Sequence, residues 1–377
     1  MKILDIESYV LTDHLNEPFY FSQWEYDTRC ICIVKVTTDS GLFGWGEGYG
    51  PAHVLKAGID FLRPFLLGLN PIENDMIWSI MYRRTLDYSR SGILMAAVSA
   101  IDVALWDVRG KALNLPVHAL LGGKRRDYLV PYATGLYFTR GDELTQKLVK
   151  EAEEYKEMNF KAIKMKVGIS IEKDIEIVHA IRKAVGPKMK LMVDSNHAYN
   201  LAEATKLCRG IEDCNIYWFE EPVSPEYYEQ YGELRKRTDI PISGGECEYL
   251  RYGFQRLFKN NSVDIAQPDI CACGGISEVK RVVTLASVYG VQVIPHSWGT
   301  RIALSAAMHV AATLDIMPGR MEMPEQLIEY DCSENALRDK LTQSVMTQEN
   351  GIIEIKDAPG LGVEVNEDYL KELLQQN

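Results

Sequence analysis

The sequence lacks the features that mark disulfide-rich and nucleic-acid-binding proteins. Its eight cysteines are scattered, and none of them belongs to a C-x-x-C pair. This usage indicates buried thiols in a reduced cytoplasmic protein and argues against a disulfide framework or a zinc site. A surplus of positive charge is also missing, because the formal net charge is −12. We therefore expect no nucleic-acid or membrane partner, since both require a cationic surface.

A signal peptide, a membrane-spanning run and a nucleotide-binding glycine loop are absent as well. The first strand-like segment carries Asp5 and Glu7 and has no cationic start. The longest apolar run, 93–106, is broken by Asp102 and is shorter than the roughly 20 residues that cross a bilayer. GWGEGYG at 44–50 does not fit G-x-G-x-x-G in any frame and is predicted to be a bend. These absences favour a cytoplasmic protein.

The length of 377 residues predicts one large domain and a smaller one, because single cores stop growing at roughly 250–300 residues. Strand-like segments followed by a helical pattern indicate a small α+β domain over residues 1–125. Within it, residues 13–28 are aromatic and aperiodic and are predicted to form a lid-like loop. Asp102 and Asp107, on the predicted helix, are expected to make ion pairs between helices. The strand-like tail, 336–377, is expected to return to the sheet of the small domain.

Residues 126–335 alternate between short apolar runs and helical patterns. About eight strand-like runs are each followed or joined by a helix, which is the order of a parallel β/α barrel. Six of these runs end on charged residues, about one strand plus one helix apart. These residues are Lys164 with Lys166, Asp194, Glu220, Glu246, Asp269 and His296. Because the C-terminal ends of barrel strands form one face, we expect these side chains to share a catalytic face.

Three successive strand ends, at Asp194, Glu220 and Glu246, carry carboxylates that would repel one another without a cation. All-oxygen ligation by Asp194, Glu220 and Glu246 favours Mg²⁺ or Mn²⁺ over zinc. The alternative, in which each acid pairs with a surface lysine, suits one acid better than three at similar spacing. Glu221 is predicted to support the ligands by accepting hydrogen bonds or by pairing with a lysine.

The remaining strand ends carry two lysines, an aspartate and a histidine. Lys164 and Lys166 point to the same face of their strand, and each is predicted to lower the pKa of the other so that one can act as a base. The alternative is a solvated basic edge. Asp269 and His296 end consecutive strands, so the carboxylate is expected to fix the imidazole tautomer. A metal and two lysines together would hold a carboxylate and stabilise the charge that develops when its α-proton leaves.

The ordered motifs K-x-K, D-x-N, E-E-P, G-G-E, Q-P-D and P-H-S-W-G resemble those of the enolase superfamily, in particular its mandelate racemase (muconate lactonizing enzyme) subgroup. The resemblance also covers YDTR, DVALWD, LLGG and PGLGVEV, and thus nearly the whole chain. It implies a modified TIM barrel of the (β/α)7β type over residues 126–335. It also implies an α+β capping domain formed by residues 1–125 and the tail.

The resemblance further implies a role for each matching residue. Mg²⁺ is expected on Asp194, Glu220 and Glu246. Lys166 and His296, the latter supported by Asp269, are expected to act on opposite faces of the substrate. The expected substrate contacts are Lys164, Asn196 and the last-strand Glu329, with Glu322 as its alternative. The cap-loop residues Arg29 and His53 are candidates for a substrate contact or, alternatively, for a structural role. His197 is a further candidate for a contact with the substrate or with the outer shell of the metal. Cys247 and Cys271-Ala272-Cys273 depart from the residues common in the family, so the identity of the substrate stays open.

The implied activity is the Mg²⁺-dependent dehydration of a sugar acid, an aldonate or aldarate, to a 2-keto-3-deoxy acid. Racemisation or epimerisation of a 2-hydroxy acid and lactone cycloisomerisation are alternatives, because they use the same metal and bases. A catalytically inactive protein on the same scaffold would lack a ligand or a base, and none is missing. A small-molecule carboxylate is therefore the expected partner, and a homo-oligomer, from dimer to octamer, is expected by analogy.

Overall fold

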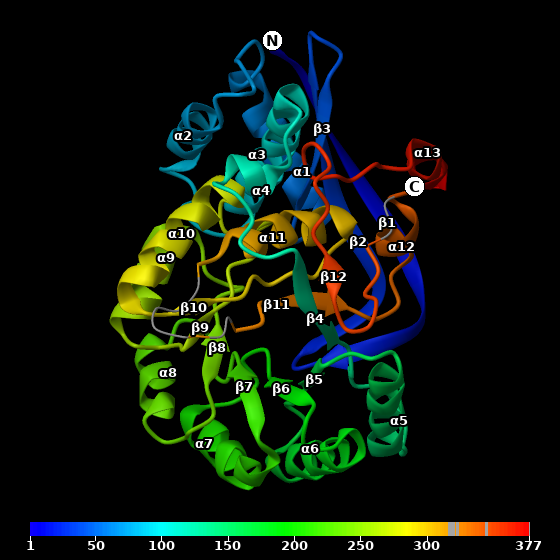
Figure 1. Cartoon of the computed structure of the whole chain (residues 1–377), viewed down its shortest axis with the longest axis vertical. Coiled ribbons are helices and arrows are strands. Elements are labelled where there is room, and N and C mark those ends of the chain that lie inside the picture. The colour runs from blue at the N-terminus through cyan, green and yellow to red at the C-terminus, as the bar shows by residue number, and fades with distance from the viewer. Residues whose placement is uncertain (316–320, 322–323, 344–345, 377) are drawn as a thin grey trace.

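The computed structural model describes residues 1–315, 321, 324–343 and 346–376, and it contains two packed parts (Figure 1). The first part is an antiparallel sheet with the order β1-β2-β3, covered by helices. Its elements are β1 (Ile3–Phe21), β2 (Trp24–Thr38), β3 (Phe43–Gly48), α1 (Ala52–Leu62), the 3-10 turn η1 (Arg63–Phe65), α2 (Asn74–Thr85), α3 (Ile93–Leu113) and α4 (Val117–Leu120). In the described chain no helix is long and apolar enough to cross a membrane.

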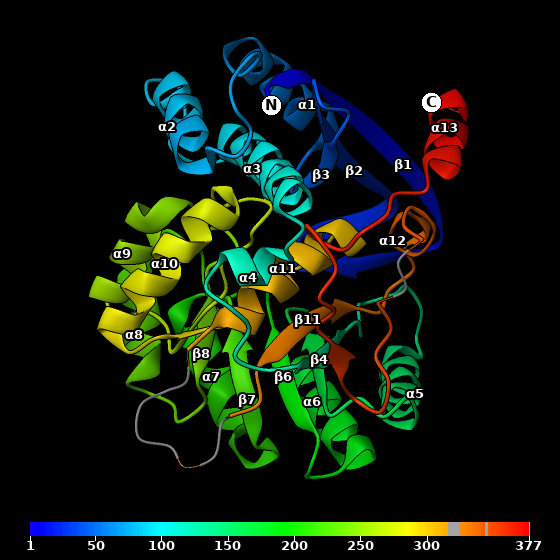
Figure 2. The same ribbon diagram turned by 45° about the horizontal axis from the view of Figure 1, so that its top comes forward.

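The second part is a barrel in which strands and helices alternate as predicted. Its elements are β4 (Tyr128–Thr134), α5 (Leu144–Glu157), β5 (Ala162–Lys166), α6 (Ile171–Val185), β6 (Lys190–Asp194), α7 (Leu201–Gly210), η2 (Glu212–Cys214), β7 (Ile216–Glu220), α8 (Tyr228–Arg235), β8 (Ile242–Gly244), α9 (Leu250–Lys259), β9 (Ile265–Ala266), α10 (Gly275–Tyr289), β10 (Gln292–Val293), α11 (Arg301–Thr313) and β11 (Leu327–Asp331). The strands pair in parallel in the order β10-β9-β8-β7-β6-β5-β4-β11. The predicted barrel is confirmed, and helices surround it (Figure 2).

The prediction of a lid-like loop over residues 13–28 is wrong, because these residues belong to a long β-hairpin. β1 and β2 pair antiparallel up to Phe21 and Trp24, with an irregular register between His14 and Phe19. Phe19 and Phe21 are buried and form a cluster with Tyr137 from the barrel. These contacts join segments far apart in sequence, so local periodicity does not show them. The hairpin nevertheless reaches the barrel, since the Tyr20 N–H donates to Phe138 O at 2.7 Å.

The GWGEGYG segment is also more regular than expected, because most of it forms strand β3. β3 packs directly on α3, and a Cβ added at Gly44 or Gly46 would overlap backbone atoms of that helix. The glycines therefore serve the close approach of a strand and a helix. α3 is buried along most of its length, since it lies between this sheet and the barrel helix α10 (Figure 2).

The tail contains α12 (Ala336–Lys340), β12 (Ile353–Glu354) and α13 (Glu367–Gln376). β12 pairs antiparallel with β4 of the barrel, so the predicted return of a tail strand to the N-terminal sheet is wrong. The tail reaches the cap as a helix, because α13 lies beside β1 and Lys35 pairs with Glu367 at 2.7 Å (Figure 1).

Two buried aspartates of α3 join the parts. Asp107 pairs with Lys111 at 2.7 Å within the helix and accepts the Leu361 N–H at 2.9 Å. Asp102 makes no ion pair in the described residues, which corrects the prediction. It accepts the backbone N–H and the hydroxyl of Ser277 on α10, at 2.9 and 2.6 Å.

Candidate active site

Four of the five predicted catalytic residues, all but Asp269, line one small cavity of about 20 Å³ at the C-terminal ends of the barrel strands. It is lined by Phe21, Tyr49, Thr134, Tyr137, Lys164, Lys166, Asn196, Glu246, His296, Trp298 and Glu329. The sequence predicts six of these residues as site residues. Strand β5 supplies both lysines, and the cap supplies Phe21 and Tyr49. The parallel register brings these ends together, since Lys166 lies opposite Asp194 and Asp194 lies opposite Glu220.

Lys166 is held at the cavity wall by two oxygen acceptors. Its Nζ donates to Asp194 Oδ2 and Asn196 Oδ1, both at 2.6 Å. The ammonium group also lies over the Phe21 ring, 4.7 Å from its centroid. Burial raises the pKa of Asp194, but Lys166 and Lys164 outweigh it and bring that pKa down to about 2. Asp194 and Asn196 therefore orient Lys166.

Lys164 is buried among carboxylates. Its Nζ lies 2.6 Å from Glu220 Oε1 and 2.9 Å from Glu329 Oε1. Burial lowers the pKa of Lys164, but these two carboxylates outweigh burial and hold the pKa well above its ordinary value. The prediction that both lysines have depressed pKa values is therefore wrong for Lys164, since the sequence does not show how closely the acids approach. Lys164 is a fixed positive charge suited to a carboxylate ligand.

His296 and Asp269 form the predicted pair on another wall of the cavity. The two residues form a parallel β-bridge, and His296 Nδ1 donates to Asp269 Oδ2 at 2.6 Å. His296 Nε2 lies 3.3 Å from Glu246 and 3.9 Å from Glu329. Burial lowers the pKa of His296, but Glu246, Glu329 and Asp269 outweigh it and raise that pKa to about 10. The ring is thus an imidazolium that can donate from Nε2.

Glu329 matches the predicted last-strand glutamate. It lies in β11, accepts the Thr134 hydroxyl at 2.6 Å, and accepts the Ser297 N–H at 3.0 Å. Burial raises the pKa of Glu329, but Lys164 and His296 outweigh it and bring the pKa down to about 2. Its alternative, Glu322, lies outside the described residues.

The carboxylates of the site outnumber its bases. Asp194, Glu220, Glu221, Glu246, Asp269 and Glu329 are all buried, against three basic side chains, Lys164, Lys166 and His296. Burial, and after it the neighbouring carboxylates, raise the pKa of Glu220 to about 7 although Lys164 opposes them. This surplus of buried oxygen donors fits a hard divalent cation.

The three predicted metal ligands do not surround a common point in the described chain. They are not among the groups of three potential ligands whose donor atoms lie within 4.8 Å of one another. Lys164 lies between two of them, at 2.6 Å from Glu220 and 3.5 Å from Asp194. The third, Glu246, faces His296. The donor chemistry therefore fits the metal, and the lysine occupies part of the space between the ligands.

Two predicted cap contacts lie elsewhere. Arg29 is buried, pairs with Asp331 at 3.2 Å and stacks on Trp298 at 4.0 Å from the ring centroid. It fastens the hairpin to the end of β11 and does not line the cavity. His53 is exposed on α1 and is likewise absent from the cavity lining.

Several contributors were not predicted from the sequence. Tyr49 packs against the His296 ring at 5.4 Å between centroids, and Trp298 Nε1 donates to the Tyr137 hydroxyl at 2.9 Å. Gln267 donates to Glu220 Oε2 at 2.6 Å. Trp298 and Gln267 stand within the recognised motifs P-H-S-W-G and Q-P-D, so the motifs contained that signal. Tyr137 carries no such signal, because only the fold brings it beneath the hairpin.

The fold and the site define a capped β/α-barrel protein with lysines and a histidine on separate walls of one small cavity. Residues 147–369 match the family described as enolase C-terminal domain-like. Residues 5–122 match the mandelate racemase / muconate lactonizing enzyme N-terminal domain. The chain belongs to the enolase superfamily, within its mandelate racemase subgroup, as predicted. Members of this superfamily bind Mg²⁺.

Relatives carry the names of both predicted activities. The structure of 3,6-anhydro-D-galactonate cycloisomerase from Zobellia galactanivorans is 55% identical, with a TM-score of 0.91 and 99% coverage of each chain. D-galactarolactone cycloisomerase of Agrobacterium fabrum is 36% identical over 99% of this chain and 98% of its own. Arabinonate dehydratase of Saccharolobus solfataricus is 36% identical over 91% of this chain and 90% of its own.

Proposed function

We propose that this protein opens the ring of a cyclic sugar acid, an anhydro-aldonate or an aldarolactone, by removing the proton α to the carboxylate and expelling the β-oxygen. The observation that carries the proposal is the placement of Lys166 and His296 on one cavity, with Lys164 and Glu329 beside them. The aromatic side chains of Phe21, Tyr137 and Trp298 line this cavity and offer apolar faces for the carbon atoms of a ring. The two relatives named as cycloisomerases support the same substrate class.

The residues divide the reaction among themselves. Lys164 binds the substrate carboxylate as a fixed positive charge, and Lys166 is the base that accepts the α-proton at Nζ. The imidazolium of His296 donates its Nε2 proton to the departing β-oxygen, while Asp269 holds the ring in place. The expelled oxygen stays attached through its second carbon, so the product is an isomer of the substrate. The enol that forms then tautomerises to a 2-keto-3-deoxy acid.

Asp194, Glu220 and Glu246 would hold the divalent cation of the site. A bound Mg²⁺, or Mn²⁺ with the same preference for oxygen, supplies positive charge that offsets the charge developing on the substrate carboxylate. Trp218 and Gln267 donate to Glu220 Oε2 at 3.0 and 2.6 Å and so orient this carboxylate.

Dehydration of an open-chain sugar acid is the second candidate, supported by the relative named arabinonate dehydratase. It needs the same proton abstraction and the same acid. The difference is that the β-oxygen leaves as water.

The test is a panel of 3,6-anhydro-aldonates, aldarolactones and open-chain aldonates, incubated with the Mg²⁺-loaded enzyme. We expect keto acid of unchanged mass from a cyclic acid, and none from the Lys166→Ala variant. Keto acid from open-chain acids alone, lighter than the substrate by one water, would establish the dehydratase instead. Deuterium exchange at the α-carbon without keto acid would indicate racemisation and refute both proposals.

A further inference from the structure

Two groups of potential metal ligands lie close together in the described chain, in addition to the carboxylates of the active site. They are His179–Asp213–Cys214 and His197–Glu221–Cys247, and in each group the donor atoms lie within 4.8 Å of one another. Both offer an imidazole, a carboxylate and a thiol. Their surroundings differ, and only the second group contains a buried ring nitrogen, His197 Nδ1, without a hydrogen bond of good geometry in the described residues.

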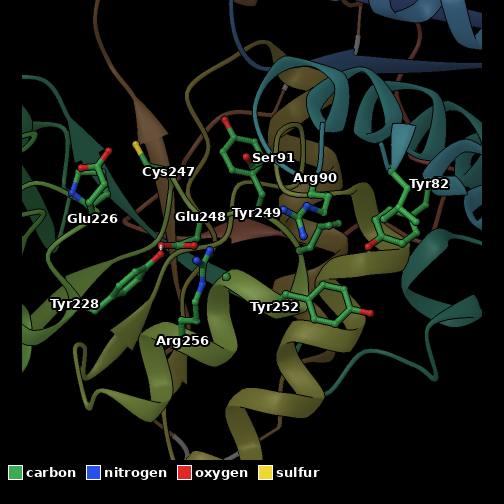
Figure 3. Close-up of a pocket in the computed structure, with 14 residues that line it drawn as sticks. Tyr82, Arg90, Ser91, Glu226, Tyr228, Cys247, Glu248, Tyr249, Tyr252 and Arg256 are labelled. Carbon is green, nitrogen blue, oxygen red and sulfur yellow. Dashed lines mark hydrogen bonds between the residues drawn. The ribbon is translucent and has the colours of Figure 1, made fainter. Parts of the chain in front are cut away.

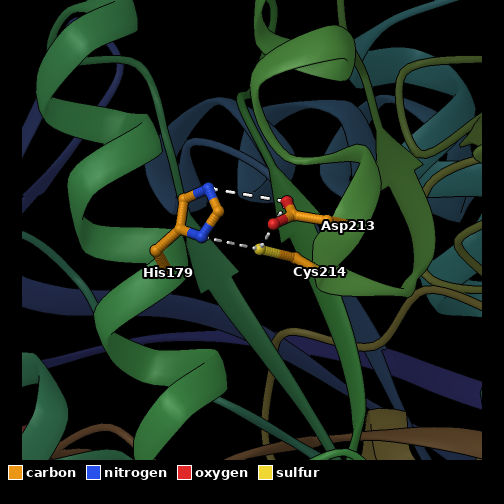
Figure 4. A group of neighbouring side chains, drawn as sticks. All are labelled: His179, Asp213 and Cys214. Carbon is orange, nitrogen blue, oxygen red and sulfur yellow. Dashed lines mark hydrogen bonds and ion pairs between the residues drawn. The ribbon is translucent and has the colours of Figure 1, made fainter.

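In the His179–Asp213–Cys214 group the imidazole faces Asp213 and Cys214, which lie next to each other (Figure 4). His179 Nδ1 lies 3.4 Å from Cys214 Sγ, and Nε2 contacts Gly210 O at 3.0 Å. Asp213 is largely exposed to solvent. Both ring nitrogens therefore have protein partners, and this group serves below as a matched control.

The His197–Glu221–Cys247 group lies at the strand ends of the barrel. His197 follows β6, Glu221 follows β7 directly, and Cys247 follows β8. His197 and Glu221 have positive φ values of 64° and 44°, so the chain turns sharply where these strands end. Each residue stands one to three positions beyond a proposed Mg²⁺ ligand, and together they form a second set of donors next to the first.

This second set is short of positive charge. Glu221 is 1% exposed, and no lysine or arginine of the described residues pairs with it. His197 Nδ1 lies 3.2 Å from Glu221 Oε2, yet this buried nitrogen makes no hydrogen bond of good geometry in the described chain. Burying a carboxylate beside an imidazole nitrogen that lacks a well-formed hydrogen bond costs free energy, unless a cation or a proton lies between the two groups. Of the two alternatives that the sequence left open for Glu221, the structure shows an accepted hydrogen bond, from Asn196 Nδ2 at 3.4 Å, and no lysine partner in the described residues.

We propose that His197, Glu221 and Cys247 bind a thiophilic divalent cation of the Zn²⁺ type, at a site separate from that of Mg²⁺. Nitrogen, oxygen and sulfur donors suit zinc, whereas Mg²⁺ prefers oxygen alone. Tetrahedral zinc sets its N, O and S ligands roughly 3.3–3.6 Å apart. His197 Nδ1 lies 3.2 Å from Glu221 Oε2, whereas His197 Nε2 lies 4.0 Å from Cys247 Sγ. Because a zinc ion binds one ring nitrogen, the Cys247 side chain must move toward the nitrogen that faces Glu221.

The proposed zinc site can be reached from a cavity that is separate from the catalytic cavity. Cys247 is half-buried and lines a separate cavity of about 610 Å³ between the barrel and the cap (Figure 3). Tyr82 and Arg90 of the cap and Tyr249 of the barrel lie along this cavity. A hydrated cation can therefore reach the Cys247 thiol without passing through the catalytic cavity.

Occupancy of this site would lower activity through a neighbouring residue. Asn196 Nδ2 donates to Glu221 Oε2 at 3.4 Å, and Asn196 Oδ1 accepts from Lys166 Nζ at 2.6 Å. A cation that draws Glu221 and His197 together removes one of the two contacts that orient Asn196. Lys166 then loses part of its support, so zinc would act as an inhibitor.

The test measures zinc bound by the full-length, Mg²⁺-saturated protein. Zinc is added, weakly bound ions are removed by gel filtration, and the metal is counted by mass spectrometry. Cobalt, as a zinc substitute, is followed by its thiolate charge-transfer absorption. We expect one zinc per chain, a thiolate–cobalt band, and affinity weakened at least about tenfold in both Cys247→Ser and His197→Gln. The Cys214→Ser control should bind zinc as the wild type does.

Several outcomes would overturn the proposal. These are no retained zinc, affinity unchanged in both Cys247→Ser and His197→Gln, or loss of zinc in Cys214→Ser. A fourth is zinc lost in Glu246→Gln but kept in Cys247→Ser, which would place the ion among the proposed Mg²⁺ ligands. If Cys247→Ser does not fold, His197→Gln decides alone. None of these measurements requires the substrate.

Discussion

Replacing Asp269 by asparagine tests the role of the Asp–His pair. The carboxylate accepts from His296 Nδ1 at 2.6 Å and is one of three acids that raise the pKa of His296 to about 10. The asparagine keeps the shape of the side chain but removes its charge. The imidazolium therefore loses a charge-assisted hydrogen bond, and its pKa falls.

The size of the effect follows from that bond. A hydrogen bond to a charged group contributes roughly 1.5–3 kcal/mol. Since about 1.4 kcal/mol corresponds to a factor of ten, the rate of β-oxygen departure should fall roughly 10- to 150-fold. The lower pKa of His296 also means that the ring loses its proton at lower pH, so the alkaline limb of the rate profile should move to lower pH.

The assay is the rate of keto-acid formation across a pH series at saturating Mg²⁺, with the thermal midpoint measured in parallel. A variant that unfolds more easily but keeps the wild-type rate and alkaline limb would refute the reasoning, because Asp269 would then be only structural.

Three other predictions follow from packing, burial and metal dependence. Burial raises the pKa of Asp102 to about 7 from 3.8 despite its bonds to Ser277. The protonated carboxyl therefore adds about 4 kcal/mol to the free energy of unfolding below about pH 4. This contribution is lost by about pH 7, as the carboxyl loses its proton in the folded protein. In urea unfolding, Asp102→Asn should gain stability over the wild type as pH rises from about 5 to about 8, and a constant difference would contradict this. Gly46→Ala should lower the thermal midpoint at a cost of about 1–3 kcal/mol, because the new methyl overlaps Ala100 O; an unchanged midpoint would contradict the tight packing of β3 on α3. Chelation of divalent cations should abolish keto-acid formation and Mg²⁺ should restore it, while full activity after chelation would exclude the proposed metal role.

The barrel could be predicted from the sequence because each of its chemically important residues ends a short apolar run. That regularity is local, so the alternation of strands and helices was visible, and with it the residues of the catalytic face. Glu329 was predicted from the same alternation, on a strand that the barrel order required.

The parts that were missed depend on contacts between distant segments. Residues 13–28 read as a loop, yet Phe19 and Phe21 keep them extended by packing on Tyr137, more than a hundred residues away. For Arg29 the sequence left open a substrate contact or a structural role, and the ion pair with Asp331 gives it a structural one. The raised pKa of Lys164 likewise depends on how closely two glutamates approach, which no spacing along the chain determines.

Central to the proposed function is the division of labour between Lys166, which removes the α-proton, and His296, which protonates the departing oxygen. The most direct measurement is deuterium exchange at the α-carbon of a cyclic sugar acid, compared with keto-acid formation, in Lys166→Ala and His296→Asn. We predict that Lys166→Ala loses both exchange and product, whereas His296→Asn keeps exchange and loses product. Exchange that persists in Lys166→Ala and disappears in His296→Asn would contradict the assigned roles.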